Sequence, residues 1–180
     1  SSLGVICFTS ISSIRAHLQL GNTNIQIVKK WMFGIIIGSI LGSLLASNIS
    51  GEILVIIFIC LALTISLNMG LQQQPILIGK DLPKLKSLNF LISFTIGFLS
   101  VLIGIGGGSF SVPTLSMFSK KIHECVGTSA VFGFLIAFPG VIMFMITGSF
   151  KENLPDYSIG YVNIIIVFLI SITSIFTANI

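Results

Sequence analysis

A glycine-rich run in the second half of the chain is the segment best suited to ligand chemistry. Residues 104–113 read Gly-Ile-Gly-Gly-Gly-Ser-Phe-Ser-Val-Pro, and glycine and proline at this density predict an interrupted helix. The interruption would expose amide N–H groups and a helix end, which can bind an anion without a buried cation. A glycine face for close helix packing is the alternative interpretation. The candidate substrate-binding residues in this run are Gly104, Gly106, Gly107, Gly108, Ser109 and Pro113.

Two hydroxyl side chains follow at the start of the next apolar run, in His123-Glu-Cys-Val-Gly-Thr-Ser129. Thr128 and Ser129 are further candidate substrate-binding residues, although hydroxyls in transmembrane helices often bond back to their own carbonyls. The sequence leaves both roles open. His123, His17 and Arg15 lie at or near segment ends, where solvation and snorkelling explain them.

Glycine motifs of soluble enzymes do not fit this run. A dinucleotide-binding GxGxxG beginning at Gly104 needs glycine where Ser109 stands, and a Walker A loop needs a Gly-Lys-Ser/Thr sequence that the chain lacks. The GxSxG elbow of hydrolases fails because Ser111 stands at its last position. We therefore expect that the protein is not an enzyme and binds no cofactor. Any work that it does on a substrate would be driven by a gradient rather than by ATP. The enzymatic alternative, an intramembrane serine hydrolase, would have to pair Ser109 with His17 or His123.

The elements that position these residues must be membrane helices. Apolar residues make up 54% of the chain and charged residues 8%, and the mean hydropathy is +1.09, whereas a soluble domain carries about a quarter charged residues. The alternating pattern of a membrane barrel is absent, which predicts an all-α polytopic helical bundle. A helical span needs about 20 residues. The six apolar segments are Ser2–Leu20, Met32–Asn48, Ile53–Met69, Phe90–Phe118, Cys125–Gly148 and Ile159–Ile180.

The positions of the acidic residues and cysteines limit the kind of ligand that the membrane segments can bind. All five acidic residues lie in loops or at segment ends, and intramembrane carboxylates mark proton and cation sites, so the pathway suits an anion better than a cation. The three cysteines occur singly, without a Cys/His cluster, which predicts no metal site. The expected partners are the lipid bilayer and a small anionic substrate, without nucleic acid, and homo-oligomer formation stays open.

Glycine recurs every fourth residue in the second segment, at Gly34, Gly38 and Gly42. These residues fall along one stripe of a helix, in the small-xxx-small pattern of closely packed membrane helices. They are predicted to be helix-packing residues.

Loop charges predict the orientation if each segment crosses once. Loops 20–31, 71–89 and 149–158 then share one side, with Lys29, Lys30, Lys80, Lys84, Lys86 and Lys151. The opposite side holds loops 49–52 and 119–124, with Lys120 and Lys121. The positive-inside rule places the first side in the cytoplasm. The long fourth segment, Phe90–Phe118, could instead fold back within the membrane, and a re-entrant fold there would change this assignment.

The chain also shows a weak internal repeat. Ser2 and Gly21 correspond to Ser129 and Gly148 with a shift of 127 residues, and residues 43–49 correspond to residues 174–180. We divide the chain into part of a first repeat (residues 1–71), a polar linker (72–89) and part of a second repeat (90–180). The repeat predicts truncation by about 40 residues before Ser1 and about 20 after Ile180, with two four-helix repeats related by a parallel arrangement.

The glycine run and the following His-Glu-x-Val-Gly-Thr-Ser resemble the signature of the sulfite exporter TauE/SafE family. Residues 1–22, with Phe8-Thr-Ser-Ile-Ser-Ser13 and Gly21-Asn22, are similar to that family's second helix. The resemblance covers essentially the whole chain. It implies a duplicated 4+4 helix transporter in the plasma membrane that exports sulfite or related organosulfonates. A structural or accessory membrane subunit without transport activity remains the other alternative.

Overall fold

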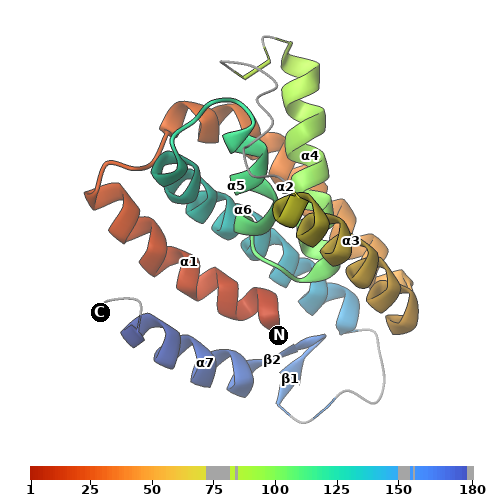
Figure 1. Cartoon of the computed structure of the whole chain (residues 1–180). Coiled ribbons are helices and arrows are strands. Elements are labelled where there is room, and N and C mark those ends of the chain that lie inside the picture. Colours follow the sequence, from red (N-terminus) through yellow and green to blue (C-terminus); the bar gives the residue numbers. More distant parts are fainter. Residues whose placement is uncertain (72–81, 84, 150–154, 156, 178–180) are drawn as a thin grey trace.

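The computed structural model describes residues 1–71, 82–83, 85–149, 155 and 157–177, and the chain there is mostly helical (Figure 1). Its helices are α1 (Ser2–Gln19), α2 (Ile25–Asn48), α3 (Gly51–Leu71), α4 (Lys86–Ile103), α5 (Gly108–Ser116), α6 (Ile122–Gly148) and α7 (Ile164–Thr177). A short antiparallel ladder joins β1 (Ser158–Ile159) to β2 (Val162–Asn163). The all-α prediction therefore holds for the fold class, with this ladder as a local addition.

Local chemistry moves two helix boundaries away from the predicted ones. Helix α2 begins at Ile25 rather than Met32, because the Asn24 side chain accepts the Ile27 N–H at 3.1 Å and caps the helix. Helix α7 begins at Ile164 rather than Ile159, because Gly160, at φ +57°, turns the chain between the two strands.

Three helices are long and apolar enough to cross a membrane: α2, α4 and α6. Shorter apolar stretches lie at Gly51–Thr64 in α3 and Ile164–Ser174 in α7. The outward faces carry exposed aliphatic and aromatic side chains such as Phe33, Leu91 and Phe168, as lipid contact requires. A helical membrane bundle is thus supported, with three rather than six spans of full length among the described residues.

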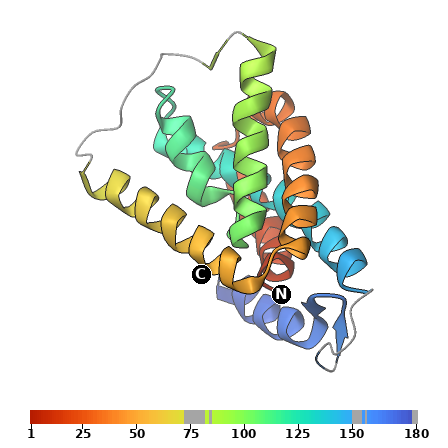
Figure 2. The same cartoon turned by 90° about the vertical axis from the view of Figure 1, so that its right-hand side faces the viewer.

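Helices α2 and α4 pack side by side and run parallel (Figure 2). A Cβ at Gly34 would lie 2.8 Å from the Phe90 carbonyl oxygen, and one at Gly42 would lie 2.7 Å from that of Phe98. Gly38, between them, faces the Phe94 carbonyl even more closely. The three glycines therefore let two backbones touch along two turns of helix.

Helix α6 joins this pair to α1. Trp31 of α2 is fully buried, stacks on Phe132 of α6 at 5.7 Å, and donates its indole N–H to Asn89 of α4 at 3.0 Å. On the other side α6 runs antiparallel to α1, since Gly127 lies against Asn22 and Gly140 against Leu3. The core of the bundle thus lies between α2, α4, α6 and α1.

Helix α5 turns back toward the end of the bundle at which α4 begins (Figure 2). Lys120, just after α5, lines the same groove as Lys30 and Lys86, and Glu124 bonds to Asn24 at 2.6 Å. Loop 119–124 therefore lies on the same side as loop 20–31, and its predicted place on the opposite side is wrong. The reason is that Phe90–Phe118 is a hairpin of two helices rather than one crossing.

Because of this hairpin, Lys120 and Lys121 lie at the same end of the bundle as the other described basic residues. Arg15, Lys29, Lys30, Lys86, Lys120 and Lys121 all lie there, while Lys80, Lys84 and Lys151 fall outside the described residues. The boundaries of loop 149–158 lie at the other end, since Gly148 packs on Gly160 and the Asn163 N–H reaches the Ser1 hydroxyl at 3.2 Å. The predicted place of this loop beside loop 20–31 is therefore wrong as well. Among the described residues, every lysine and Arg15 lie at the end that holds loop 20–31, the lysine-rich end, which the positive-inside rule predicts to be cytoplasmic.

The directions of the helices also overturn the parallel arrangement predicted for the repeat. Helix α1 corresponds to α6 in the repeat, yet the two run antiparallel. Helix α2 starts at the lysine-rich end, and its counterpart α7 starts at the other end, where Val167 meets Gly4. These directions do not fit parallel repeats, and the duplication itself stays a prediction.

Candidate functional site

The helix break falls within the predicted glycine run. Helix α4 ends at Gly104, whose φ is +72°, and the Gly104 and Ile105 N–H groups bond back to the Val101 and Ser100 carbonyls at 3.0 and 3.1 Å. This is the usual way to close a helix, and glycine takes the left-handed position without strain. Four residues later α5 begins, so both helix ends belong to one short turn.

The turn leads back to the middle of α6. A Cβ at Gly107 would lie 2.8 Å from the Gly133 nitrogen and 2.9 Å from the Phe132 carbonyl carbon. A Cβ at Gly106 would lie 3.2 Å from the nearest carbon of the Ile6 side chain of α1. Helix α5 therefore starts beside the middle of α6, and Gly107, directly before it, occupies a position that only glycine permits because backbone atoms of α6 lie against it.

The first turn of α5 presents polar groups at this depth. The Ser111 N–H is the first to bond within the helix, to the Gly107 carbonyl at 3.0 Å, and the amides before it have no intrahelical partner. Gly108 has open space around it, with the Ser129 hydroxyl 4.0 Å from a Cβ placed there. Ser109 is exposed at this turn. The helix dipole adds partial positive charge, which suits an anion.

Pro113 lies inside α5 rather than in the break. The predicted interruption of Gly104–Pro113 is thus shorter than expected, because the helix resumes at Gly108 and continues through the proline. Pro113 has no N–H for the Ser109 carbonyl, four residues earlier, so it weakens α5 without ending it.

Thr128 and Ser129 are consecutive residues of α6, but their side chains face different neighbours. The Ser129 hydroxyl faces Gly108 and bonds back to the Val126 carbonyl at 2.8 Å. The Thr128 hydroxyl instead accepts the Asn24 N–H at 3.0 Å, and its side chain is fully buried. Consecutive helical residues point about 100° apart, so one of the pair lies at the break and the other holds the loop between α1 and α2.

That loop is tied to α6 by side chains that the sequence did not single out. Asn24 donates its side-chain N–H to Glu124 at 2.6 Å, and the Thr23 hydroxyl donates to the Gly127 carbonyl at 3.4 Å. Asn24 thereby caps α2 and contacts α6 at once. An asparagine just before an apolar helix is a capping signal that could have identified it.

Ser10 of α1 is a second residue that the sequence reasoning missed as a site candidate. It is 7% exposed, and its hydroxyl lies 2.9 Å from a Cβ placed at Gly133, the residue that also contacts Gly107. Hydroxyls of Ser10 and Ser129 therefore flank the region where α5 starts. The serine-rich stretch 9–13 was the available signal, but it did not distinguish inward from outward positions.

The hydrolase alternative requires a hydrogen bond from Ser109 to an imidazole. In the part of the chain that the structure describes, no hydrogen bond joins Ser109 to His17 or His123. His123 instead lines a polar groove with Lys121 and Glu124 near loop 21–26.

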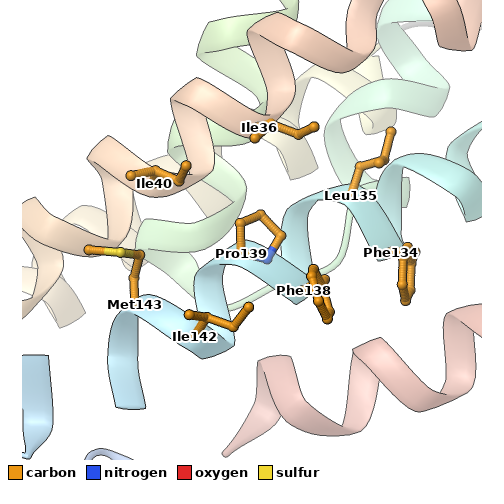
Figure 3. A pocket seen from close by; sticks show the side chains of 8 residues that line it. All are labelled: Ile36, Ile40, Phe134, Leu135, Phe138, Pro139, Ile142 and Met143. Atoms are coloured by element: carbon orange, nitrogen blue, oxygen red, sulfur yellow. The ribbon is translucent and has the colours of Figure 1, made fainter. Parts of the chain in front are cut away.

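An apolar groove between α2 and α6 is separate from these polar groups. Figure 3 shows Pro139, Phe138 and Phe134 of α6 along one wall, with Ile36 and Ile40 of α2 above them. The groove measures about 340 Å³, and its lining consists of apolar side chains, Met143 included. Such a surface fits lipid chains or another helix and offers nothing to an anion. A smaller cavity of about 200 Å³ reaches Gly104 from the start of α1.

Comparison with known proteins gives two matches. The family model described as Sulfite exporter TauE/SafE matches residues 1–180. A protein of Haemophilus influenzae called "Probable membrane transporter protein" is 33% identical over 183 residues, which cover 99% of this chain and 67% of that relative. No solved structure matches the chain.

Proposed function

The chain belongs to the sulfite exporter TauE/SafE family, and on this premise we propose that it exports small anions such as sulfite or organosulfonates. The Haemophilus influenzae relative is named as a transporter, which agrees with this class of activity. The chain carries no nucleotide motif, so a gradient supplies the energy. The protein crosses the plasma membrane several times.

The observation that carries the proposal is the start of α5 beside the middle of α6. The amides of the first turn, which have no partner within the helix, lie here beside the Ser129 hydroxyl, and the Ser10 hydroxyl lies nearby against Gly133. Half-helix N-termini of this kind hold anionic groups in transporters with broken helices. We assign substrate contact to Gly108, Ser109 and Ser129, with Gly104, Gly106, Gly107 and Pro113 shaping the turn and Thr128 holding the neighbouring loop.

The proposed architecture is a duplicated bundle in which residues 1–71 and 90–180 belong to two repeats, with linker 72–89 between them. The opposite directions of α1 and α6 support an inverted relation. In inverted-repeat transporters the substrate lies at the interface of the repeats, near the bilayer midplane. Here α1 and α6 form that interface, and the α5 start lies beside it.

A flux experiment tests the function and the site separately. The protein is reconstituted into liposomes, and efflux of sulfite and of a short organosulfonate is followed under an imposed proton gradient. Gly108→Leu should fold, because open space surrounds Gly108, and should lower the flux at least tenfold by filling the space at Ser129. Gly51→Leu is the matched control, since nothing lies within 4 Å of a Cβ at Gly51.

The outcomes distinguish the two claims. If liposomes containing the wild-type protein show no flux of any tested anion, the proposed transport activity is wrong. Normal flux through folded Gly108→Leu would remove the site and leave the function. In that case the close contacts of Gly106 and Gly107 with α1 and α6 would favour a packing role for the turn, as expected of a structural membrane subunit.

A further inference from the structure

A groove at the lysine-rich end has the features of a lipid site. It lies between the N-terminal parts of α2 and α4, measures about 690 Å³, and is lined by Lys30, Lys86 and Lys120. The same groove is lined by Phe33 and Phe90, which are 66% and 43% exposed. Cationic heads and exposed aromatic rings thus share one surface, and no carboxylate of the described residues lines it.

The apolar part of this surface continues along α4 toward the middle of the bundle. Lys86, Phe90, Phe94 and Phe98 are spaced four residues apart, so they lie on one helix face. Their rings stack in sequence, with centroids 6.2 Å apart for Phe90 and Phe94 and 5.8 Å apart for Phe94 and Phe98. The lysine therefore stands at the head of a row of stacked rings.

Helix α2 provides a matching edge. Lys30, Phe33, Ile37 and Leu41 follow at spacings of three and four residues, and the last three are between 42% and 66% exposed. Because α2 and α4 run parallel (Figure 2), the two lysines lie at the same level and the two apolar rows descend together.

The upper wall of the groove is held in place by Asn89. Its side-chain N–H donates to the Leu85 and Pro83 carbonyls at 3.0 and 2.5 Å, and its oxygen accepts from buried Trp31. Asn89 is 6% exposed. The segment before α4 is thereby fixed over the groove, which gives the site a formed shape rather than a loose surface.

We propose that this groove binds an anionic glycerophospholipid, with its phosphate between Lys30, Lys86 and Lys120 and one acyl chain along Phe90, Phe94 and Phe98. Lys30 and Lys86 bring positive charge to a groove that no carboxylate among the described residues lines, and this charge selects an anionic headgroup. The stacked rings select hydrocarbon, because burying apolar surface is favourable for a chain and offers nothing to a soluble anion. The site does not depend on the proposed transport, since it needs only the membrane and these side chains.

The test compares lipids and lysine variants by native mass spectrometry of the purified protein in detergent. Phosphatidylglycerol should bind in preference to phosphatidylcholine with the same chains. The double variant Lys30→Gln/Lys86→Gln should weaken phosphatidylglycerol binding roughly 10- to 30-fold, because each lysine near the headgroup contributes about a factor of five. The matched control Lys29→Gln/Lys121→Gln removes the same charge from the same end but outside the groove, and should change binding by less than threefold.

A variant in the apolar row separates lipid from soluble anion. Phe94→Ala leaves every lysine in place and should weaken phosphatidylglycerol binding several-fold, while inorganic phosphate should not compete at millimolar concentration. Equal losses in both lysine pairs would overturn the site in favour of diffuse surface charge. Competition by phosphate, with no effect of Phe94→Ala, would overturn it in favour of a vestibule for soluble anions. Size-exclusion profiles and helical circular dichroism, unchanged from wild type, show that each variant is folded.

Discussion

Two regions of this molecule are built on glycine, and they use it in opposite ways. In α2, Gly34, Gly38 and Gly42 leave the helix continuous and let it touch the α4 backbone. Between α4 and α5, glycines at 104 and 106–108 end one helix and start another. Glycine spaced by four clears one helix face for a neighbour. Glycines placed nearly side by side remove the side chains that would otherwise hold the backbone helical.

The largest expected effect lies in the continuous helix, at Gly38. Gly38→Val puts a branched side chain against the Phe94 carbonyl in the parallel pair, where neither backbone can retreat. We expect a loss of about 3 kcal/mol or more, measured as heat-induced loss of the monodisperse peak in detergent. Gly51→Val is the control at an open position. A Gly38→Val protein as stable as wild type would show that α2 and α4 do not pack as described.

A smaller loss is expected at Gly107 in the break. Gly107→Ala brings a methyl group against the Phe132 and Gly133 backbone, so α5 must shift at a cost of roughly 1–3 kcal/mol. Gly108→Ala, one residue later, meets nothing closer than 4.0 Å and should gain up to about 1 kcal/mol from helix propensity. The same melting assay measures both. Equal stabilities for the two variants would mean that α5 does not start against α6.

The smallest effect belongs to backbone conformation at Gly104. Gly104→Ala forces a side chain into φ +72° and should cost about 1–2 kcal/mol, whereas Gly104→Asn should cost less. Gly21 has nearly the same φ, +67°, with nothing within 4 Å of a Cβ, so Gly21→Ala isolates the conformational cost. If alanine and asparagine at position 104 lower the melting temperature equally, contact with Ser2 rather than φ determines the effect.

Some of the candidate site could be predicted because the signals are local. The density of glycine placed the break, and the four-residue spacing of Gly34, Gly38 and Gly42 placed a smooth helix face. The cap that Asn24 gives α2 was a local signal as well, but the contacts of Asn24 and Ser10 with α6 could not be predicted in this way. Their roles depend on which residues of α6, 100 or more positions away, come to lie beside them.

The direction of α5 was the decisive unknown. A run of apolar residues as long as Phe90–Phe118 fits one tilted crossing or a hairpin, and hydropathy is the same for both. Contacts of Gly107 with α6 and the shared groove of Lys120 and Lys86 select the hairpin. The side of loop 119–124 and the opposite directions of α1 and α6 follow from that single turn.

Composition and residue spacing by themselves determined the helical membrane class, the position of the break and the small-residue face of α2. These properties are local, because hydropathy and backbone freedom act residue by residue. Only the tertiary structure decided that α5 turns back, that Ser129 and not Thr128 faces the break, and that the lysines meet at one groove. These properties depend on contacts between segments that are far apart in the sequence, and the sequence alone does not show which segments are in contact.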